Sequence, residues 1–387
     1  MTEKPIFILA GEPSGDQLAA HMMKALNVRF GPIDWVGVGG PAMCGQGLTP
    51  LIDMDALTIF GFGRALISYL SLSRLMDRLV DDVMAKQPRL VLTVDVKGFS
   101  LRFAGRLRRR MQQAGWSAPI VHTVAPTVWA WGAWRAGKFA AAMDGILCLF
   151  PFEPAYFTRY HLPAEFIGHP EAFLAPVEMP CRSLSADGKK TVLLLPGSRR
   201  SELDLILPDM VAAAQTLNQD NQNKIRFILP AVSRWRRHIK TMVSGAPWIN
   251  VVDGGDALGP WLCQADAMMA TSGTITMQTA LHGVPGVTAY RSGYISAAIG
   301  RRLVNFDKII LPNAILGRQV YPFLFQQQLN AGALAAAVQL CLDDETHAIN
   351  ARQDAVDLRA CLTGGLPAFD DMICPALAPW LGCYPTS

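Results

Sequence analysis

The chain has 387 residues, which is enough for two or three domains that each bury a core of their own. It is 51% hydrophobic and 17% charged, yet no apolar run approaches the roughly 18 residues of a membrane-spanning helix. The net charge of +4 is too small to indicate a nucleic-acid partner, and the eight cysteines form no CxxC pair, which argues against a disulfide framework or a cysteine metal cage. Because the first apolar stretch, Ile6–Ala10, is too short for a signal peptide, we expect a cytoplasmic protein.

Short apolar segments alternate with helical segments along the chain, the pattern of a parallel α/β architecture. In the first half we predict strands at Ile6–Ala10, Trp35–Val38, Leu90–Val94, Ile120–Val124 and Gly145–Leu149. In the second half we predict strands at Thr191–Leu195, Ile225–Leu229, Ile249–Val252, Ala267–Ala270 and Gly286–Tyr290. The simplest fold is two Rossmann-like, doubly wound parallel-sheet domains facing across a cleft, with ligands at the carboxyl ends of the strands.

The domain boundaries follow from composition. Residues 175–190 contain proline, serine and glycine with little periodicity and are predicted to link domains at 1–174 and 191–345. The chain is predicted to be helical from Ala331 to about Leu362 and then interrupted by proline and glycine. We expect residues 346–387 to form a helical tail that packs back on the first domain.

Polar residues follow two strands of the first half. Glu12, Ser14 and Asp16 surround a glycine turn after the first strand, ahead of a helix predicted from Gln17 to about Val28. They are candidates to bind sugar hydroxyls, and capping of the helix by Ser14 and Asp16 is the alternative. Asp95 ends an otherwise apolar strand at the same predicted edge, which makes it a candidate general base, with a capping or turn role as the alternative.

The most unusual stretch is Leu195–Glu202, with the sequence LPGSRRSE, between a predicted strand and a helix that Ser198 is expected to cap. Arg199 and Arg200 oppose the helix macrodipole there, which typically costs roughly 0.3–1 kcal/mol each. Such a pair predicts a bound anion, because free N–H groups and guanidinium groups both suit phosphate. The alternative is that both arginines point to solvent.

A second turn of this kind follows the strand at Ala267–Ala270. Gly273 would let a ligand approach the backbone, and Ser272 and Thr274 would add hydroxyl donors. Alone this turn is better explained as a helix cap. Together, the two turns indicate that the second half binds a nucleotide diphosphate.

Two other ligand classes are disfavoured. The stretch Gly37–Ala42 fits a loose dinucleotide pattern but lacks an acidic residue about 20 positions later to hold a ribose. The seven histidines show no ligand spacing, and the Asp53-Met54-Asp55 triplet has no supporting cluster and is expected to be a solvated turn. We therefore predict no catalytic metal and no cofactor.

Motifs spread over nearly the whole chain resemble one family. They are, in chain order, AGEPSGD (10–16), GVGGPAM (37–43), HTVAPTVWAW (122–131), PFE (151–153), IGHP (167–170), LPGSRRSE (195–202), SGT (272–274), YR (290–291), LPN (311–313) and GR (317–318). In these segments the chain resembles the lipid-A-disaccharide synthases, inverting glycosyltransferases of the two-domain GT-B type (family 19). The LPGSR and VWAW segments are the most specific.

The resemblance implies an activity and roles for residues. The family condenses UDP-2,3-diacylglucosamine with 2,3-diacylglucosamine 1-phosphate to the β-1,6-linked lipid A disaccharide and UDP. Two residues would be catalytic. Asp95 would take the proton of the acceptor 6-hydroxyl, and Arg199 would hold the diphosphate as charge develops on the leaving UDP, in a single displacement that needs no covalent intermediate and no metal. The residues that would bind the UDP donor are Gly197, Ser198, Arg199, Ser272, Gly273, Thr274, Gln278, Arg291, Asn313 and Arg318. His122 and Trp129 become candidates for the acceptor site, although Trp129 is also suited to fill a core.

Acyl chains need an apolar surface, and the stretch at 60–72 offers one through Phe60, Phe62, Leu66, Ile67 and Leu70. A basic stretch, Arg102, Arg106, Arg108, Arg109 and Arg110, lies on a predicted helix further along the chain. Together they are candidates to hold lipid substrates and the anionic cytoplasmic face of the inner membrane. A buried core helix and a solvated face are the respective alternatives, and a homodimer is left open.

Four positions depart from the family pattern. Gln278 replaces a glutamate that bonds the ribose, Phe323 follows Pro322 in place of a glutamate, Gly98 replaces a second aspartate, and Ala125 replaces a serine. Gln278 and Phe323 keep open a divergent paralogue without catalysis. A second alternative is another GT-B UDP-sugar transferase or epimerase, against which the apolar stretch at 60–72 argues. A nicotinamide enzyme is a third alternative, which the missing ribose carboxylate disfavours.

Overall fold

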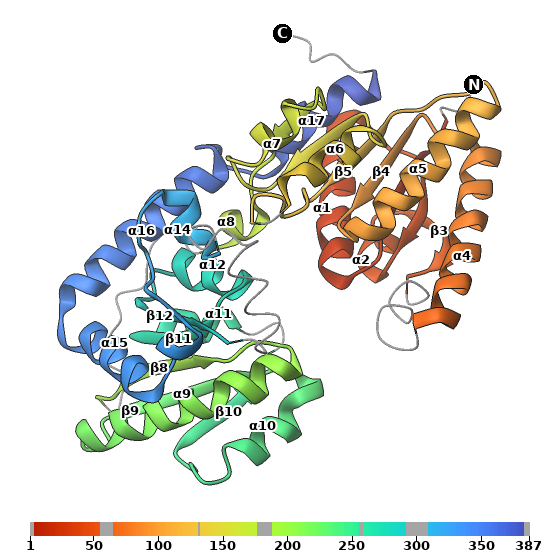
Figure 1. Cartoon of the computed structure of the whole chain (residues 1–387). Helices are drawn as coiled ribbons and strands as arrows, with labels where there is room; N and C mark the ends of the chain where they lie inside the picture. Colours follow the sequence, from red (N-terminus) through yellow and green to blue (C-terminus); the bar gives the residue numbers. More distant parts are fainter. Residues whose placement is uncertain are drawn as a thin grey trace. The chain divides into compact units, whose positions relative to one another are not determined.

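The computed structural model of the chain describes residues 4–54, 65–130, 132–175, 188–254, 258–291 and 309–382, with only the backbone for 65–71. The chain divides into two compact units, each built on a parallel sheet (Figure 1). Unit 1 comprises Met1–Phe173 and Leu362–Ser387, and unit 2 comprises Leu174–Cys361. Residues 346–361, expected in the tail, therefore belong to unit 2.

The sheet of unit 1 has seven parallel strands in the order β3-β2-β1-β4-β5-β6-β7. Their bounds are Ile6–Ala10 (β1), Trp35–Gly39 (β2), Leu48–Asp53 (β3), Leu90–Val94 (β4), Ile120–Thr123 (β5), Gly145–Cys148 (β6) and Ala164–Phe166 (β7). Central strands are buried on both faces, which is why they read as continuous apolar runs. In β1, Phe7 and Leu9 enter the core on one face, while Ile6, Ile8 and Ala10 enter the core on the other.

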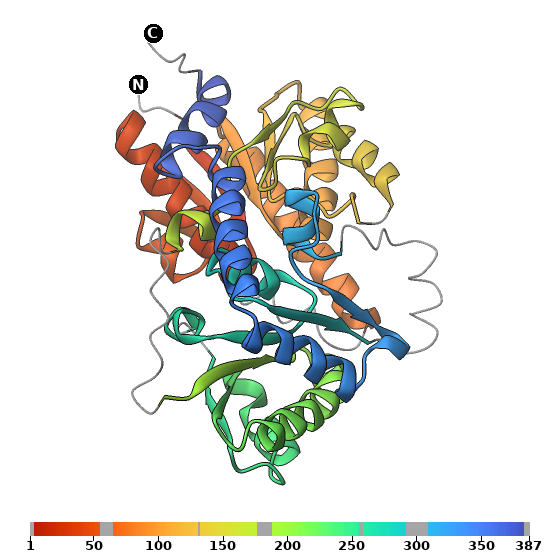
Figure 2. The same ribbon diagram turned by 90° about the vertical axis from the view of Figure 1, so that its left-hand side faces the viewer.

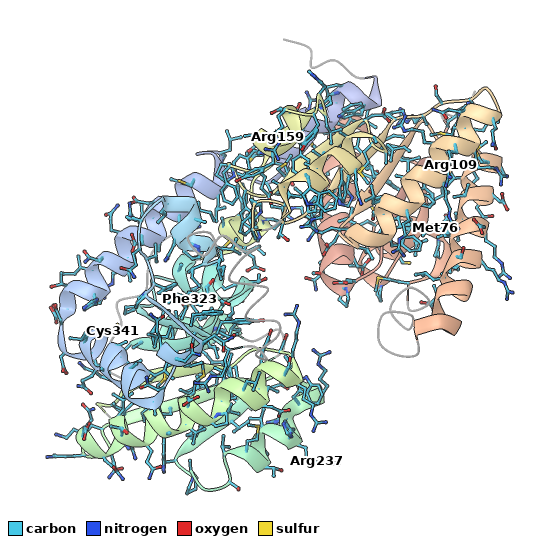
Figure 3. The ribbon with its side chains drawn as sticks, viewed as in Figure 1. Met76, Arg109, Arg159, Arg237, Phe323 and Cys341 are labelled. Carbon is cyan, nitrogen blue, oxygen red and sulfur yellow. The ribbon has the colours of Figure 1, made fainter. Side chains whose placement is uncertain are left out.

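Helices cover both faces of this sheet. Their bounds are Pro13–Phe30 (α1), Pro41–Cys44 (α2), Ala65–Lys86 (α4), Lys97–Gln113 (α5), Ala136–Ala140 (α6), Pro154–Thr158 (α7), Pro170–Leu174 (α8) and Asp370–Leu381 (α17). On one face α4 and α5 lie side by side, and Met76 of α4 faces the core there (Figure 3). On the other face α17, blue in Figure 2, lies against the red α1.

The sheet of unit 2 has six parallel strands in the order β10-β9-β8-β11-β12-β13. The strands are Lys190–Leu195 (β8), Ile225–Ala231 (β9), Ile249–Asp253 (β10), Ala267–Thr271 (β11), Gly286–Tyr290 (β12) and Phe323–Phe325 (β13). The α-helices are Arg200–Asp220 (α9), Arg236–Met242 (α10), Leu258–Gln264 (α11), Thr274–Leu281 (α12), Leu311–Leu316 (α14), Ala331–Asp343 (α15) and Glu345–Thr363 (α16). Short 3-10 turns lie at Ser233–Trp235 (η3) and Gln326–Gln328 (η5), with a third in unit 1 at Ala133–Arg135 (η2). The main core of the unit lies between one face of the sheet and helices α9 and α15.

All ten predicted strands are present, with ends that differ by at most two residues. Three strands were not predicted. β3 contains Pro50 and is mostly exposed at the sheet edge, while β7 and β13 have only three residues each. Asp53, expected in a solvated turn, is the last residue of β3. The helix α17 lies in the tail that was expected to be helical, but its bounds were not predicted because Pro375 and Pro379 interrupt the helical pattern. In the part of the chain that the structure describes, no helix is both long and apolar enough to span a membrane.

Candidate functional site

Asp95 lies at the carboxyl end of β4, in a backbone conformation that side chains rarely adopt. Its φ is 54°, that of Val96 is 43°, and that of Val124, after the neighbouring strand β5, is 74°. Positive φ is unusual for β-branched residues, and each such residue costs of order 1–3 kcal/mol. Hydrogen bonds hold the loop in place: Asp95 N–H donates to Thr123 O (3.0 Å), and Ser100 Oγ donates to Asp95 O (2.9 Å). Backbone strain that the surrounding structure holds in this way is typical of active and ligand-binding sites.

Lys97, which the sequence analysis did not single out, is the ion-pair partner of Asp95. Its Nζ lies 3.4 Å from Asp95 Oδ1, and the two side chains are 34% and 24% exposed. Lys97 is the first residue of α5, so the strand-to-helix turn itself places the ammonium beside the carboxylate. The sequence signal that could have identified Lys97 is its position two residues after Asp95, at the start of a predicted helix. The edge of unit 1 therefore presents a partly exposed carboxylate held by a cation.

The first turn of α1 reaches the same edge. A Cβ built on Gly15 would lie 3.7 Å from Asp95 Cβ, which brings the segment after β1 beside the segment after β4. Glu12 and Ser14 are exposed there, and neither side chain caps α1. We name this arrangement of Asp95, Lys97, Gly15, Glu12 and Ser14 the unit 1 edge site.

Asp16 has a structural role, which corrects its expected role in sugar binding. It is 4% exposed, and its carboxylate accepts hydrogen bonds from the backbone N–H groups of Gly40 (2.8 Å), Ala42 (3.0 Å) and Met43 (3.1 Å). It therefore caps α2, a helix that follows another strand, and not its own helix. Both carboxylate oxygens are engaged, which leaves the side chain no free face toward a ligand.

His122 is also buried, and its side chain has no exposed surface for the sugar contact that was expected of it. Its Nδ1 lies 2.8 Å from Thr93 Oγ1. Burial, and secondarily the nearby charge of Lys97, lowers the pKa of His122 to about 3. The ring is therefore neutral at physiological pH, and its Nε2 has no hydrogen-bond partner among the residues described.

Trp129 is a core residue, which was the alternative to a place in an open acceptor site. It is 7% exposed, and its Nε1 donates to Glu153 Oε1 at 3.0 Å. Glu153 is 1% exposed, and its Oε2 accepts from the N–H groups of Leu149 and Phe150, both at 3.1 Å. Burial raises the pKa of Glu153 to about 7 against the opposing effects of these hydrogen bonds and of Lys97. The PFE segment signalled Glu153, but its role was visible only in the structure.

The two turns of unit 2 are neighbours in the structure. β8 pairs with β11, with Leu195 opposite Ala270, so Gly197–Arg199 and Ser272–Thr274 follow adjacent strand ends. A Cβ built on Gly197 would lie 3.0 Å from Thr271 Cγ2. Gly197 and Gly273 have φ values of 102° and 152°, which favour glycine. We call this arrangement the unit 2 turn site.

The carboxylate of Glu202 lies against the first of these turns. Its Oε2 accepts from the backbone N–H groups of Ser198 and Arg199, both at 3.2 Å, and its Oε1 accepts from the Arg199 guanidinium at 3.0 Å. Ser198 therefore does not cap α9; Arg199 is the N-cap residue, and Glu202 satisfies the N–H groups. The Arg199 side chain is 76% exposed. These donors are the ones that the sequence assigns to a diphosphate.

The Ser198 carbonyl faces two donors from the turn after β9. Arg234 donates to it at 2.8 Å and the Trp235 indole N–H at 2.9 Å. Strand β9 is the other neighbour of β8, so three successive strand ends meet at this site. The basic SRWRR run was the signal for these residues, which the sequence analysis missed.

Three of the remaining donor candidates make contacts within the protein. Arg291 pairs with Asp209 and donates to the carbonyls of Leu205 and Leu329. Asn313 Oδ1 accepts from the N–H groups of Val320 and Tyr321, and its Nδ2 donates to Tyr321 O. The Arg318 guanidinium binds Asp354 and Asp357 of α16. To bind UDP as predicted, these three side chains would have to share their present contacts with the nucleotide. The fourth candidate, Gln278, lies half-buried on α12.

The acyl candidates lie outside the described residues: Phe60 and Phe62 fall in an undescribed segment, and the side chains of Leu66, Ile67 and Leu70 are not described. The basic stretch of α5 is largely paired, unlike the cationic surface expected. Arg106 binds Asp77 at 2.7 Å, and Arg110 binds Asp81 at 2.8 Å. Arg108 binds Asp144 at 2.8 Å. Over the described ranges, no group of three or more His, Cys, Asp or Glu side chains is placed to hold a metal ion.

Comparisons with known proteins decide the family. The sequence model of the lipid-A-disaccharide synthetase family matches residues 6–363. Lipid-A-disaccharide synthase of Rhodospirillum centenum is 36% identical over 360 residues, covering 91% of this chain and 87% of its own. The enzyme of that name from Pseudomonas aeruginosa is 35% identical over 346 residues, covering 88% and 89%.

The chain belongs to the lipid-A-disaccharide synthase family. As a member of this family it is a glycosyltransferase of lipid A biosynthesis. Solved structures agree in fold: UDP-GlcNAc 2-epimerase from Neisseria meningitidis, with a TM-score of 0.64 at 10% identity, covers 97% of this chain and 99% of its own. MurG from Acinetobacter baumannii, with a TM-score of 0.56 at 14% identity, covers 96% and 99%. The predicted fold class, two parallel-sheet α/β domains of the GT-B type, is confirmed.

Proposed function

We propose that the chain condenses UDP-2,3-diacylglucosamine with 2,3-diacylglucosamine 1-phosphate to form the β-1,6 lipid A disaccharide 1-phosphate and UDP. The observation that carries the proposal is the family match over residues 6–363, in which Asp95 and the LPGSR turn stand at the carboxyl ends of parallel strands. Ligands of open α/β sheets bind at such strand ends.

In the proposed reaction Asp95 removes the proton from the acceptor 6-hydroxyl as that oxygen attacks the anomeric carbon of the donor. The new C–O bond forms as the bond to the UDP phosphate oxygen breaks, so the anomeric centre inverts in one displacement. Lys97 holds the Asp95 carboxylate by its ion pair. Glu12 and Ser14 are exposed beside Asp95 and are suited to hydrogen-bond the acceptor sugar.

The donor diphosphate is assigned to the unit 2 turn site. Charge that develops on the leaving UDP would be met by the N–H groups around Gly197 and Gly273 and by Arg199. Because Glu202 occupies the donors of the first turn, a phosphate there must share or replace these hydrogen bonds. Gln278 keeps an acceptor oxygen for the ribose but lacks the charge of a glutamate, so we expect donor binding to be weaker than with glutamate and still present.

The substrates carry acyl chains, so we also propose that the protein works peripherally at the cytoplasmic face of the inner membrane. No resident metal or cofactor enters the proposed reaction. Chelation is therefore expected to leave the activity unchanged, and the assay below includes EDTA for that reason.

The test is an assay in detergent micelles with both substrates and EDTA, in which UDP and tetraacyl disaccharide phosphate are measured. Asp95→Asn should lower turnover by about 10²–10⁴-fold and leave UDP binding unchanged. Asp77→Asn is the matched control, because Asp77 is a 61% exposed carboxylate of the same unit that pairs with Arg106. Near-normal turnover of Asp95→Asn would exclude Asp95 as the base. UDP binding without product would point to another acceptor, and absence of both would favour a non-catalytic relative.

A further inference from the structure

The outer face of η3 and α10 in unit 2 has an unusual composition. A shallow, open hollow of about 650 Å³ is lined by Ser233, Arg236, Arg237, Lys240, Thr241 and Ser244. Three of these side chains are cations and three are hydroxyls; the Thr241 hydroxyl donates to the Arg237 carbonyl at 3.1 Å, and the other five can donate hydrogen bonds to a ligand. The lining contains no carboxylate and no apolar side chain. A surface of this kind is complementary to an anion.

The packing of α10 explains why this face is free. Ile239 and Val243 are buried in the core of unit 2, with Trp235 and Met242 packed against it. The lining residues follow the complementary helical spacing on the solvent side. Arg237 stands on this outer side of unit 2 in Figure 3.

Acidic residues near the face neutralise it only in part. Asp253 lies 4.0 Å from Arg236, at the limit of an ion pair, and Asp204 is engaged by Arg200 and His238. Arg237 and Lys240 are exposed, and the ion pairs of this segment among the described residues involve Arg236 and His238 instead. Arg236 and Lys240 are like charges at i and i+4, an arrangement that destabilises a helix without a counterion.

The same segment supports the unit 2 turn site. Arg234 and Trp235 of η3 donate to the Ser198 carbonyl, at 2.8 and 2.9 Å, and α10 begins at the next residue. The cationic face is therefore continuous in sequence with the residues that hold the turn assigned to the donor diphosphate. Whatever binds the face lies close to that turn within unit 2.

We propose that the η3–α10 face binds phosphate groups of anionic phospholipids and is a contact of unit 2 with the membrane surface. This inference rests on the proposed function, because that function places both acylated substrates in a membrane. An open hollow with a row of cations suits many phosphates displayed on a surface better than one enclosed ion. The paired arginines of α5 offer less free charge for this purpose.

The test measures co-sedimentation of the full chain with vesicles of phosphatidylcholine alone or mixed with phosphatidylglycerol. Wild type should bind the anionic vesicles and lose binding as salt rises. Each cation near such a surface contributes about a fivefold change in affinity, so Arg237→Gln/Lys240→Gln should bind about 30-fold more weakly. Lys240→Gln alone should bind the anionic vesicles more weakly than its control, Lys224→Gln. The control also removes an exposed lysine of unit 2, but one that lies just before the amino end of β9.

Folding and catalysis are measured separately. Both lining cations are outside the proposed catalytic and donor machinery, so the double variant should keep its thermal midpoint and its activity in detergent micelles. The inference is overturned if wild type does not prefer anionic vesicles, or if the double variant binds them like wild type. It is also overturned if inorganic phosphate alone saturates the face and displaces the vesicles. Absence of product in micelles would instead contradict the proposed function.

Discussion

The substitution Glu153→Gln tests the most strongly buried carboxylate among the described residues of unit 1. Burial holds the pKa of Glu153 at about 7, whereas the unfolded chain has a value near 4.5. Because the folded pKa is raised, this group stabilises the fold fully below the unfolded value, and that contribution is lost as pH rises toward the folded value. The interval between 4.5 and about 7 corresponds to about 3 kcal/mol, at 1.36 kcal/mol for each unit of pH.

The glutamine cannot titrate, but it does not reproduce the hydrogen bonds. Both oxygens of Glu153 face donors, from Trp129 on one side and from Leu149 and Phe150 on the other. The amide NH₂ must therefore oppose one of these N–H groups, which should cost about 1–3 kcal/mol at every pH. The advantage of wild type over the variant should then shrink by about 3 kcal/mol as pH rises from 4.5 to above 7.

Urea unfolding of both proteins across this pH range measures that difference, and subtraction cancels the titration of the other groups. The chain has two units, so the transition of unit 1 is identified as the one that Glu153→Gln shifts. A difference that stays constant with pH would refute the argument. A difference that grows with pH would mean that the three hydrogen bonds to the carboxylate outweigh its burial.

Three further predictions concern single contacts. Asp16→Ala leaves the N–H groups of Gly40, Ala42 and Met43 without their acceptor, so it should lower the free energy of unfolding by about 3 kcal/mol. Thermal unfolding measures this change, and a loss well below about 1 kcal/mol would contradict the capping role. Gly197→Ala places a methyl group at φ 102°, with its Cβ 2.3 Å from a Glu202 oxygen, so it should cost about 1–3 kcal/mol and weaken UDP binding in calorimetry. Arg318→Ala removes a guanidinium that is 47% exposed and should change stability by no more than about 1 kcal/mol, despite its two ion pairs.

The fold was predictable from sequence because strands that are buried on both faces leave continuous apolar runs. All ten such runs are strands. The strands that escaped prediction lie at sheet edges or have three residues, so too few of their side chains are buried to leave a pattern. The position of both unit 2 turns after strands predicted that they share one edge of a parallel sheet, whereas the pairing of β8 with β11, which makes the turns neighbours, came from the structure.

Side-chain partners were much less predictable, because a partner can come from any element that packs nearby. From the sequence, Asp16 was expected to bind a sugar or to cap its own helix. It instead caps a helix that begins 25 residues later at Pro41. The arginines of α5 read as a free cationic surface, yet the aspartates of α4 lie alongside them. For Lys97 and Glu202 the sequence indicated only a position near a helix start. The contact of Lys97 with Asp95, and that of Glu202 with the turn at Gly197, depend on the backbone geometry and were found only in the structure.

Unit 1 is assembled from two stretches of chain that are separated by the whole of unit 2. The buried face of α17 covers α1, Trp380 rests over Gly145, and His169 N–H donates to Leu362 O where the chain returns. A ribosome therefore releases all of unit 2 before it releases the helix that completes unit 1. During that interval α1, with Met22 and Leu26, packs on the strands of its own sheet but lacks the cover of α17, so this side of unit 1 is completed last.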